Sequence, residues 1–290
     1  MEELVALSRY TTIGTGGPAR YFARPETVGE LQETLRFAVA EGLPAVAIGL
    51  GSNLLVHDDG VDAVVVKLAG ALAEARVEGA MLVAGGGAAN AVCLHRARAA
   101  GLGGFEFASA IPGTAGGGVM MNAGAYGVEW RDVLVDAVVV DAGRARRLTP
   151  GELGLSYRHS GLEPGQVVAE VRFRLEPSST EAVKAKAAGL LAQRKATQPT
   201  NKRTFGSVFK NPATGPGAGA LIEACGLKGF SVGGALVSPR HANFIENAGG
   251  ATSADCIAVM AEARRRVHER FGVLLEHEVR FLGPLALPPV

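Results

Sequence analysis

A glycine-rich stretch from Ser109 to Gly127 carries the clearest indication of chemistry in the sequence. It reads SAIPGTAGGGVMMNAGAYG, with apolar residues interleaved among the glycines. Because each glycine costs conformational entropy on folding, such a run is typical of backbone that lies directly against a ligand. Bare amides suit the oxygens of a pyrophosphate, and missing side chains leave room for a flat ring. The stretch therefore predicts a nucleotide cofactor, and with Pro112 and its glycines we expect all of it to be loop.

A shorter glycine turn at residues 49–53, with the sequence GLGSN, follows the apolar run Ala45–Ile48. Small residues let consecutive backbone N–H groups converge on an anion, and Ser52 and Asn53 add side-chain donors. A tight turn between two strands explains the same residues equally well. Leu54 stands where a dinucleotide motif has its last glycine, and no helix is expected to open here, which argues against a Rossmann site for NAD.

Composition narrows the class of protein. The chain has 290 residues, a formal net charge of +1 and 48% hydrophobic residues, enough for two or three domains with buried cores. A balanced charge gives no support for nucleic-acid binding. Three well-separated cysteines show no metal-ligand spacing, so no metal site is expected. The acidic start lacks the pattern of a signal peptide, and the uncharged run Phe107–Val128 holds too much glycine for a membrane helix. We expect a soluble cytoplasmic protein without a membrane partner.

Periodicity and turn residues predict the elements that position these loops. Helices are expected at residues 27–41, 89–100, 180–194, 218–225 and 253–271. Strands are expected at residues 45–48, 63–67, 81–84, 134–141, 144–148, 167–175, 273–275 and 279–282. The two kinds of element are mixed without a regular βαβ repeat, which indicates an α+β fold.

The two glycine loops and several later motifs resemble one family throughout the chain. Their order and spacing are similar to the FAD-binding region of the UDP-N-acetylenolpyruvoylglucosamine reductases. The similarity continues through YRHS at 157–160, GSVFKNP at 206–212, AGALIEACGLKG at 218–229, HANFIEN at 241–247 and LEHEVRFLG at 275–283. It implies a vanillyl-alcohol-oxidase/PCMH-type FAD-binding fold in two subdomains, residues 1–67 and 68–177. A C-terminal α+β substrate domain, residues 178–290, would return its last strands to the active site.

The resemblance implies noncovalent FAD, since no histidine precedes Ser52 where many oxidases of the wider fold attach flavin. The implied FAD contacts are Gly49, Leu50, Gly51, Ser52, Asn53 and Leu54 in the first loop, and Ile111, Pro112, Gly113, Thr114, Gly116, Gly117, Asn122, Gly124, Ala125 and Tyr126 in the second.

Three residues match catalytic positions of the family. Arg158 would clamp the enolpyruvyl carboxylate with its planar guanidinium, although a lone arginine is ordinarily a surface ion-pair partner. Ser207 would donate a proton, although the same serine in another context is a turn residue. Glu278 would orient the enol ether; Glu276 shares its face on a regular strand, so the residues alone do not choose between them. The resemblance also implies substrate contacts at Lys210, Asn211 and His241.

The function that follows from the resemblance is the NADPH-dependent, FAD-mediated reduction of the enolpyruvyl group of UDP-N-acetyl-3-O-(1-carboxyvinyl)-glucosamine to UDP-N-acetylmuramate, in peptidoglycan precursor synthesis. The short interval between Arg158 and Ser207 resembles the branch of the family that lacks an extra tyrosine loop. A monomer or weak homo-oligomer is expected. Two alternatives remain: a flavin oxidase acting on another alcohol or sugar, and a flavin-binding regulator without catalysis.

Overall fold

The computed structural model describes residues 1–290, and contacts divide the chain into two units. The first unit comprises Met1–Glu3, Arg20–Leu50 and Asp62–Gln193, and the second comprises Leu4–Ala19, Gly51–Val61 and Arg194–Val290. The three-part division at residues 67 and 177 stays a prediction.

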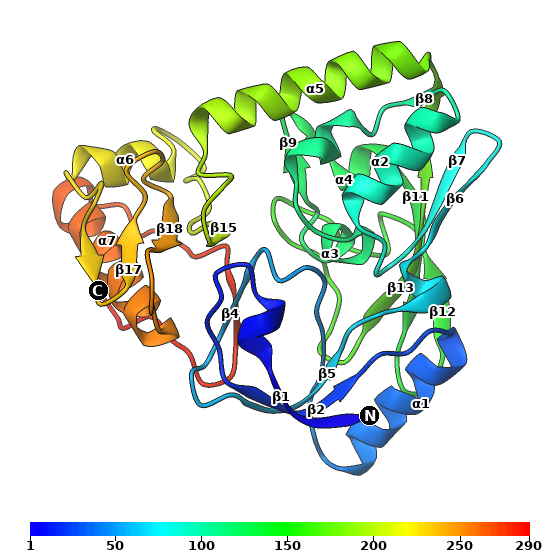
Figure 1. Cartoon of the computed structure of the whole chain (residues 1–290), viewed down its shortest axis with the longest axis horizontal. Helices are drawn as coiled ribbons and strands as arrows, with labels where there is room; N and C mark the ends of the chain where they lie inside the picture. Colours follow the sequence, from blue (N-terminus) through cyan, green and yellow to red (C-terminus); the bar gives the residue numbers. More distant parts are fainter. The chain divides into compact units, whose positions relative to one another are not determined.

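The first unit contains a five-stranded antiparallel sheet in the order β12-β11-β13-β7-β6 (Figure 1). Its strands are β6 (Ala75–Glu78), β7 (Met81–Gly85), β11 (Leu134–Val140), β12 (Ala145–Leu148) and β13 (Val167–Arg174). Helices α2 (Asn90–Ala99), α3 (Ala115–Met120) and α4 (Trp130–Val133) contribute to the core on one face. The rings of Phe105, Phe107, Trp130 and Phe173 meet there with centroids 4.9–5.9 Å apart. This aromatic cluster fixes the sheet against the segment that carries α3.

A second sheet has the order β1-β2-β5-β3, formed by β1 (Glu2–Ala6), β2 (Pro18–Ala23), β5 (Val61–Val66) and β3 (Ala45–Ala47), with β3 parallel to β5. Helix α1 (Val28–Ala40) begins at Thr27, whose side chain accepts a hydrogen bond from Glu30 N–H. The helix buries Leu31, Leu35 and Ala38 in a core shared with β5 and β13. Two short pairs, β9 (Gly124–Ala125) with β10 (Val128–Glu129) and β8 (Leu102–Gly103) with β14 (Glu176–Pro177), complete the strands. The 3₁₀ turns are η1 (Leu7–Tyr10), η2 (Gly70–Ala73) and η3 (Glu106–Ala110).

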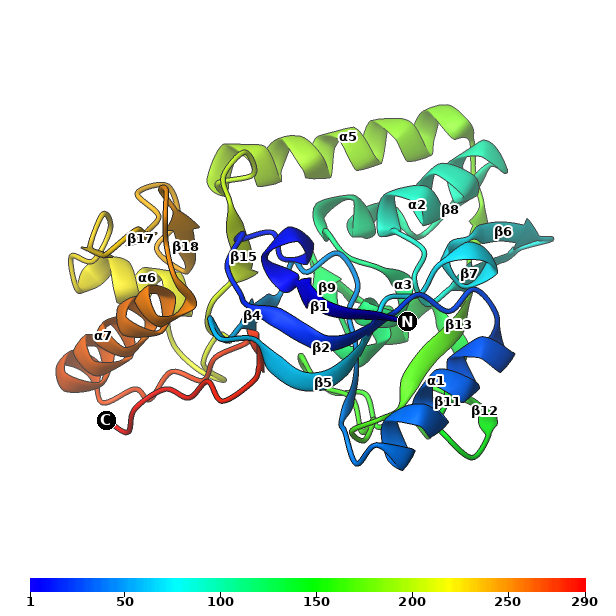
Figure 2. The ribbon, with the colours of Figure 1, turned by 60° about the horizontal axis from the view of Figure 1, so that its bottom comes forward.

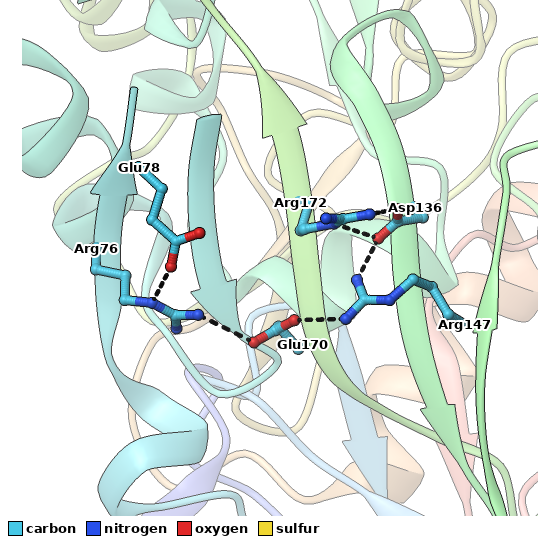
Figure 3. Close-up of polar contacts among 6 residues, drawn as sticks. All are labelled: Arg76, Glu78, Asp136, Arg147, Glu170 and Arg172. Atoms are coloured by element: carbon cyan, nitrogen blue, oxygen red, sulfur yellow. Dashed lines mark hydrogen bonds and ion pairs between the residues drawn. The ribbon is translucent and has the colours of Figure 1, made fainter. Parts of the chain in front are cut away.

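The exposed part of the five-stranded sheet carries a continuous ion-pair network across four of its strands (Figure 3). Asp136 is only 5% exposed and joins two arginines, accepting from Arg147 Nη1 at 2.6 Å and from Arg172 Nε at 2.8 Å. The guanidinium of Arg172, helped by that of Arg147, lowers the pKa of this carboxyl against the opposing effect of burial. The members are Arg76, Glu78, Asp136, Arg147, Glu170 and Arg172. Their charges balance, so we interpret the network as structural.

The second unit packs α6 (Ala218–Ala224) and α7 (Ser253–Phe271) with a sheet in the order β15-β18-β17-β16 (Figure 2). These strands are β15 (Thr204–Ser207), β16 (Ser231–Val232), β17 (Ala235–Val237) and β18 (Phe244–Asn247). A separate parallel pair joins β4 (Leu54–Val56) to β19 (Arg280–Leu282). Through that pair, Arg280–Leu282 lies beside the strand that follows the first glycine turn. Helix α5 (Thr180–Thr197) runs from the first unit into the second.

Most predicted elements are confirmed, and two predictions are wrong. Residues 107–128 are not all loop, because α3 forms within them: Thr114 caps its first turn, and its glycines allow close packing of the helix. Residues 273–275 form no strand. Leu275 is buried in the core with α7, and its carbonyl accepts from Arg264 Nε at 3.2 Å instead of joining a ladder. No helix of the chain combines the length and apolar composition that a membrane crossing needs.

Candidate active site

The two glycine-rich loops meet within the first unit. A side chain at Gly49 would place its Cβ 2.8 Å from Thr114 Oγ1, closer than real Cβ contacts come. The same Thr114 hydroxyl accepts a hydrogen bond from Gly117 N–H at 3.3 Å at the start of α3. Glycine at 49 is therefore required so that the first turn can reach the second loop.

Backbone N–H groups are available as hydrogen-bond donors where the two glycine-rich loops adjoin. The backbone N–H groups of Leu50, Gly113 and Thr114 donate no hydrogen bond within the chain. Unused N–H groups from two adjoining loops suit the oxygens of a phosphate. On this observation the residues present fit the pyrophosphate of FAD, which Leu50, Gly113 and Thr114 would hold.

Several glycines of the second loop are explained by the protein itself. A Cβ at Gly118 would lie 2.2 Å from Trp130 Cε2, so the flat group against the backbone there is an indole. A Cβ at Gly116 would lie 2.9 Å from the Gly86 carbonyl oxygen, and one at Gly124 would lie 2.8 Å from that of Val128. Gly117 is different: it is exposed, and its only close neighbour is the Thr114 hydroxyl at 3.3 Å. Among these positions, Gly117 is the one that leaves backbone open to a ligand.

Asn122 and Tyr126 already have partners in the fold. Asn122 is fully buried; its Nδ2 donates to Glu129 Oε2 at 2.9 Å and to the Ser156 carbonyl at 3.0 Å. The Tyr126 hydroxyl donates to the Leu190 carbonyl in α5 at 2.9 Å, and the residue is 46% exposed. These contacts hold the second loop in shape, which leaves a direct contact with the cofactor as a prediction for both residues. Ala125, predicted beside them, pairs with Val128 in the β9–β10 pair.

Arg158 lies against the second loop. It occupies a tight turn closed by a bridge between Ser156 and His159, with a φ of 54°. Its Nη2 donates to the Gly124 carbonyl at 2.9 Å, and its guanidinium carbon is 4.9 Å from the centre of the Tyr157 ring. The turn thus fixes a cation beside a loop that the sequence predicts to hold the flavin.

Ser207 and Glu278 come together in the second unit. Glu278 N–H donates to the Val208 carbonyl at 2.8 Å, next to Ser207 at the end of β15. Asn53 joins them, since its Nδ2 donates to the Glu278 carbonyl at 3.1 Å. A Cβ at Gly206 would lie 3.1 Å from the Ser52 carbonyl oxygen. The second half of the first glycine turn is therefore packed against both predicted catalytic segments.

The surroundings of Glu276 distinguish it from Glu278. The Glu276 side chain is 76% exposed and pairs with Lys210, Nζ to Oε2, at 3.5 Å. Glu278 is half-buried and its backbone is tied to Asn53 and Val208. Glu278 is thus the less exposed and the more firmly held of the two residues, and its role as the carboxylate of the site stays a prediction. Lys210 has an acidic neighbour in Glu276.

Asn211 and His241 have structural roles beside α6. Asn211 Oδ1 accepts from Ala218 N–H at 3.0 Å, at the first residue of that helix. His241 Nδ1 accepts from Asn243 N–H at 3.2 Å. Burial, and to a smaller extent the charge of Lys228, lowers the pKa of His241, so this imidazole is neutral at pH 7. Their contact with substrate stays a prediction.

The chain is similar to known proteins in sequence and in structure. Family models match residues 19–148 as an FAD binding domain and residues 198–282 as the C-terminal domain of UDP-N-acetylenolpyruvoylglucosamine reductase. UDP-N-acetylenolpyruvoylglucosamine reductase 2 of Symbiobacterium thermophilum is 46% identical over 96% of this chain and 90% of its own. The reductase of Sphingopyxis alaskensis is 44% identical over 93% and 90%. The crystal structure of the Thermus caldophilus enzyme is 38% identical and covers 97% of this chain and 98% of its own, with a TM-score of 0.85.

The chain belongs to the UDP-N-acetylenolpyruvoylglucosamine reductase family. As a member of this family it is an oxidoreductase and a flavoprotein. The predicted vanillyl-alcohol-oxidase/PCMH-type fold is confirmed by the FAD-binding match and by the Thermus caldophilus reductase, which is similar over nearly the whole chain. Between Arg158 and Ser207 the chain has β13, β14, the long helix α5 and the first residues of β15. Membership in the branch without the tyrosine loop stays a prediction.

Three residues contact segments of the predicted site but are not predicted from the sequence as site residues. Lys67 donates from Nζ to the Gly49 carbonyl at 2.9 Å. Asn90 is 2% exposed; its Nδ2 donates to the Ile111 carbonyl at 2.9 Å, while its Oδ1 has no partner. Arg280 follows Glu278 by two residues, its N–H donates to the Asn53 carbonyl at 3.1 Å, and partial desolvation lowers the pKa of its guanidinium. For Lys67, its position as a charged residue directly after an apolar run is the sequence pattern that could have indicated a role at the site.

Proposed function

We propose that this chain uses NADPH, through FAD, to reduce the enolpyruvyl group of UDP-N-acetyl-3-O-(1-carboxyvinyl)-glucosamine in the cytoplasm. The product is UDP-N-acetylmuramate, a precursor of peptidoglycan. The observation that carries the proposal is the joining of the Ser207 and Glu278 segments through Val208 and Asn53, at the first glycine turn. The relatives described above, named for this reductase activity, support it over most of the chain.

FAD, when bound, would supply the hydride chemistry that links NADPH to the substrate. Hydride adds to the vinyl carbon farther from the carboxylate, and the electron pair of the double bond moves to the nearer carbon and its carboxylate. Negative charge therefore develops beside the carboxylate, where a fixed guanidinium stabilises it. Arg158, held by the Gly124 carbonyl, is the residue we assign to that role.

Ser207 gives its hydroxyl proton to the carbon that has gained the electron pair, which completes the D-lactyl ether. A serine is a weak acid, so it serves this step only because the carbon beside it is strongly basic. Glu278 orients the enol ether oxygen and the developing charge together with Arg158. Lys210 contributes a cation at the edge, and Asn211 and neutral His241 contribute hydrogen bonds to the sugar nucleotide.

A flavin spectrum of the purified protein tests the proposal. The protein is expected to be yellow and to bleach under anaerobic conditions on addition of NADPH. The enolpyruvyl UDP-sugar is expected to restore the flavin band within seconds and to be converted to the lactyl ether. Restoration by O₂ but not by the UDP-sugar would identify a flavin oxidase or dehydrogenase for another substrate. A yellow protein that does not bleach would contradict the reductase assignment altogether.

A further inference from the structure

Lys67 lies next to the first glycine turn, immediately after β5. Strand β5 is parallel to β3, and Ile48 N–H donates to the Val66 carbonyl at 2.9 Å, so the two strands end side by side. The half-buried Lys67 side chain donates from Nζ to the Gly49 carbonyl at 2.9 Å. No step of the proposed mechanism uses this lysine.

The hydrogen bond to Gly49 determines where the next amide points. The Gly49 carbonyl and the Leu50 N–H belong to one planar trans peptide and therefore point in opposite directions. A carbonyl held by Lys67 turns the Leu50 N–H away from the lysine. Thr114 packs against the Gly49 Cα from another side, which limits rotation of the turn. Lys67 and Thr114 together fix a donor that has no acceptor within the chain.

The charge of Lys67 also favours an anion near the turn. Burial lowers the pKa of this ammonium, and the neighbouring Arg24 guanidinium lowers it further. An anion bound at the turn would raise that pKa again, and by linkage the charged lysine would raise the affinity for the anion by the same factor.

We propose that Lys67 is a positioning residue of the flavin site, which holds the Gly49 carbonyl so that the Leu50 N–H faces the pyrophosphate of FAD. Its charge adds an electrostatic contribution to the same interaction. The inference rests on the FAD-dependent function proposed above and adds to it a residue that has no part in hydride or proton transfer.

The test is the dissociation constant of FAD from the holoenzyme, measured by the flavin fluorescence released on dilution. Lys67→Met removes the donor and the charge at similar side-chain length. We expect it to raise the Kd about 10- to 100-fold, the usual value of one charge-assisted hydrogen bond. Lys67→Arg should recover most of the affinity. Lys184→Met, at an exposed position of α5, is the matched control and should leave the Kd unchanged.

The salt dependence of FAD binding distinguishes a contribution from the charge of Lys67 from a merely structural role of this residue. Raising the ionic strength should weaken FAD binding more in the wild type than in Lys67→Met. A Kd within about twofold of wild type in Lys67→Met, or the same salt dependence in both proteins, would overturn the proposal. If Lys67→Met does not fold, Lys67→Gln keeps a neutral donor, and an unchanged salt dependence there would overturn it as well. A wild-type protein that binds no FAD would instead refute the proposed function.

Discussion

Adjacent glycines of α3 should respond in opposite ways to the same substitution. At Gly118 an alanine Cβ would lie 2.2 Å from Trp130 Cε2. At Gly117 the nearest atom would be Thr114 Oγ1, at 3.3 Å, on the exposed side of the helix. The pair therefore separates a glycine required by packing from one that leaves the backbone open.

The expected magnitudes follow from these distances. Trp130 is fully buried and surrounded by three phenylalanine rings, so its indole has little freedom to move away from a new methyl group. Overpacking of this kind costs about 1–3 kcal/mol, and alanine returns up to about 1 kcal/mol of helix propensity. Because the overlap with the indole is deep, the cost falls near the upper end of that range, and Gly118→Ala should lose about 2 kcal/mol of unfolding free energy after the helix-propensity gain. Gly117→Ala should be neutral or gain as much as about 1 kcal/mol.

Thermal unfolding of the two variants measures this difference directly. Because the chain has a single tryptophan, its fluorescence reports on the site of the clash. Gly118→Ala should unfold several degrees below the wild type with a shifted emission maximum, whereas Gly117→Ala should not. Since Gly117 is a predicted FAD contact, Gly117→Ala should in addition raise the Kd for FAD.

Equal melting temperatures for Gly118→Ala and the wild type would refute the packing argument. A Gly117→Ala protein with unchanged FAD affinity would show that the open backbone at this position is not used by the cofactor.

Two further predictions concern residues that are not among the predicted site residues. Asp136→Asn should lower the unfolding free energy at pH 7 by about 1–3 kcal/mol, because it weakens hydrogen bonds to two arginines. Since those arginines lower the pKa of Asp136, its stabilising contribution is present at neutral pH and is lost as the pH falls through the lowered pKa. The difference in melting temperature between variant and wild type should therefore shrink below about pH 4, and a constant difference would contradict this account. Burial raises the pKa of Cys93 and of Cys256 to about 12, whereas Cys225 is half-exposed. A maleimide should therefore label one thiol of the native protein and all three after unfolding, and mass spectrometry counts the labels.

Elements with strong local signals are predicted well from the sequence. Helix α7 is found at the predicted residues 253–271, because Thr252 and Asp255 form a capping box and Gly272 ends it with a φ of 68°. The hairpin of β11 and β12 is likewise found, since Asp141 accepts the N–H groups of Gly143 and Arg144 in the turn.

The errors arise where distant residues decide the structure. The sequence does not predict helix α3, because three consecutive glycines disfavour a helix locally. The missing side chain at Gly118 leaves space for the indole of Trp130, which lies twelve residues further along the chain. The apolar run at 273–275 has a strand-like composition, but its contacts are with α7. In both cases tertiary packing outweighs local preference.

The glycine content of the second loop was only a partial indicator of its role. A flat group does lie on bare backbone at Gly118, but that group is the side chain of Trp130. What the structure adds is the contact of Gly49 with Thr114 and the position of Lys67, neither of which residue spacing can supply. The roles of Arg158, Ser207 and Glu278 stay proposals, supported by the segments that hold them.

Rapid mixing of the two half-reactions tests the central claim most directly. In Ser207→Ala, reduction of the flavin by NADPH should proceed at nearly the wild-type rate. Reoxidation by the enolpyruvyl UDP-sugar should slow by about 10²–10⁴-fold, the usual contribution of a general acid. If both half-reactions slow equally, or neither slows, Ser207 is not the proton donor and the assignment of this site is wrong.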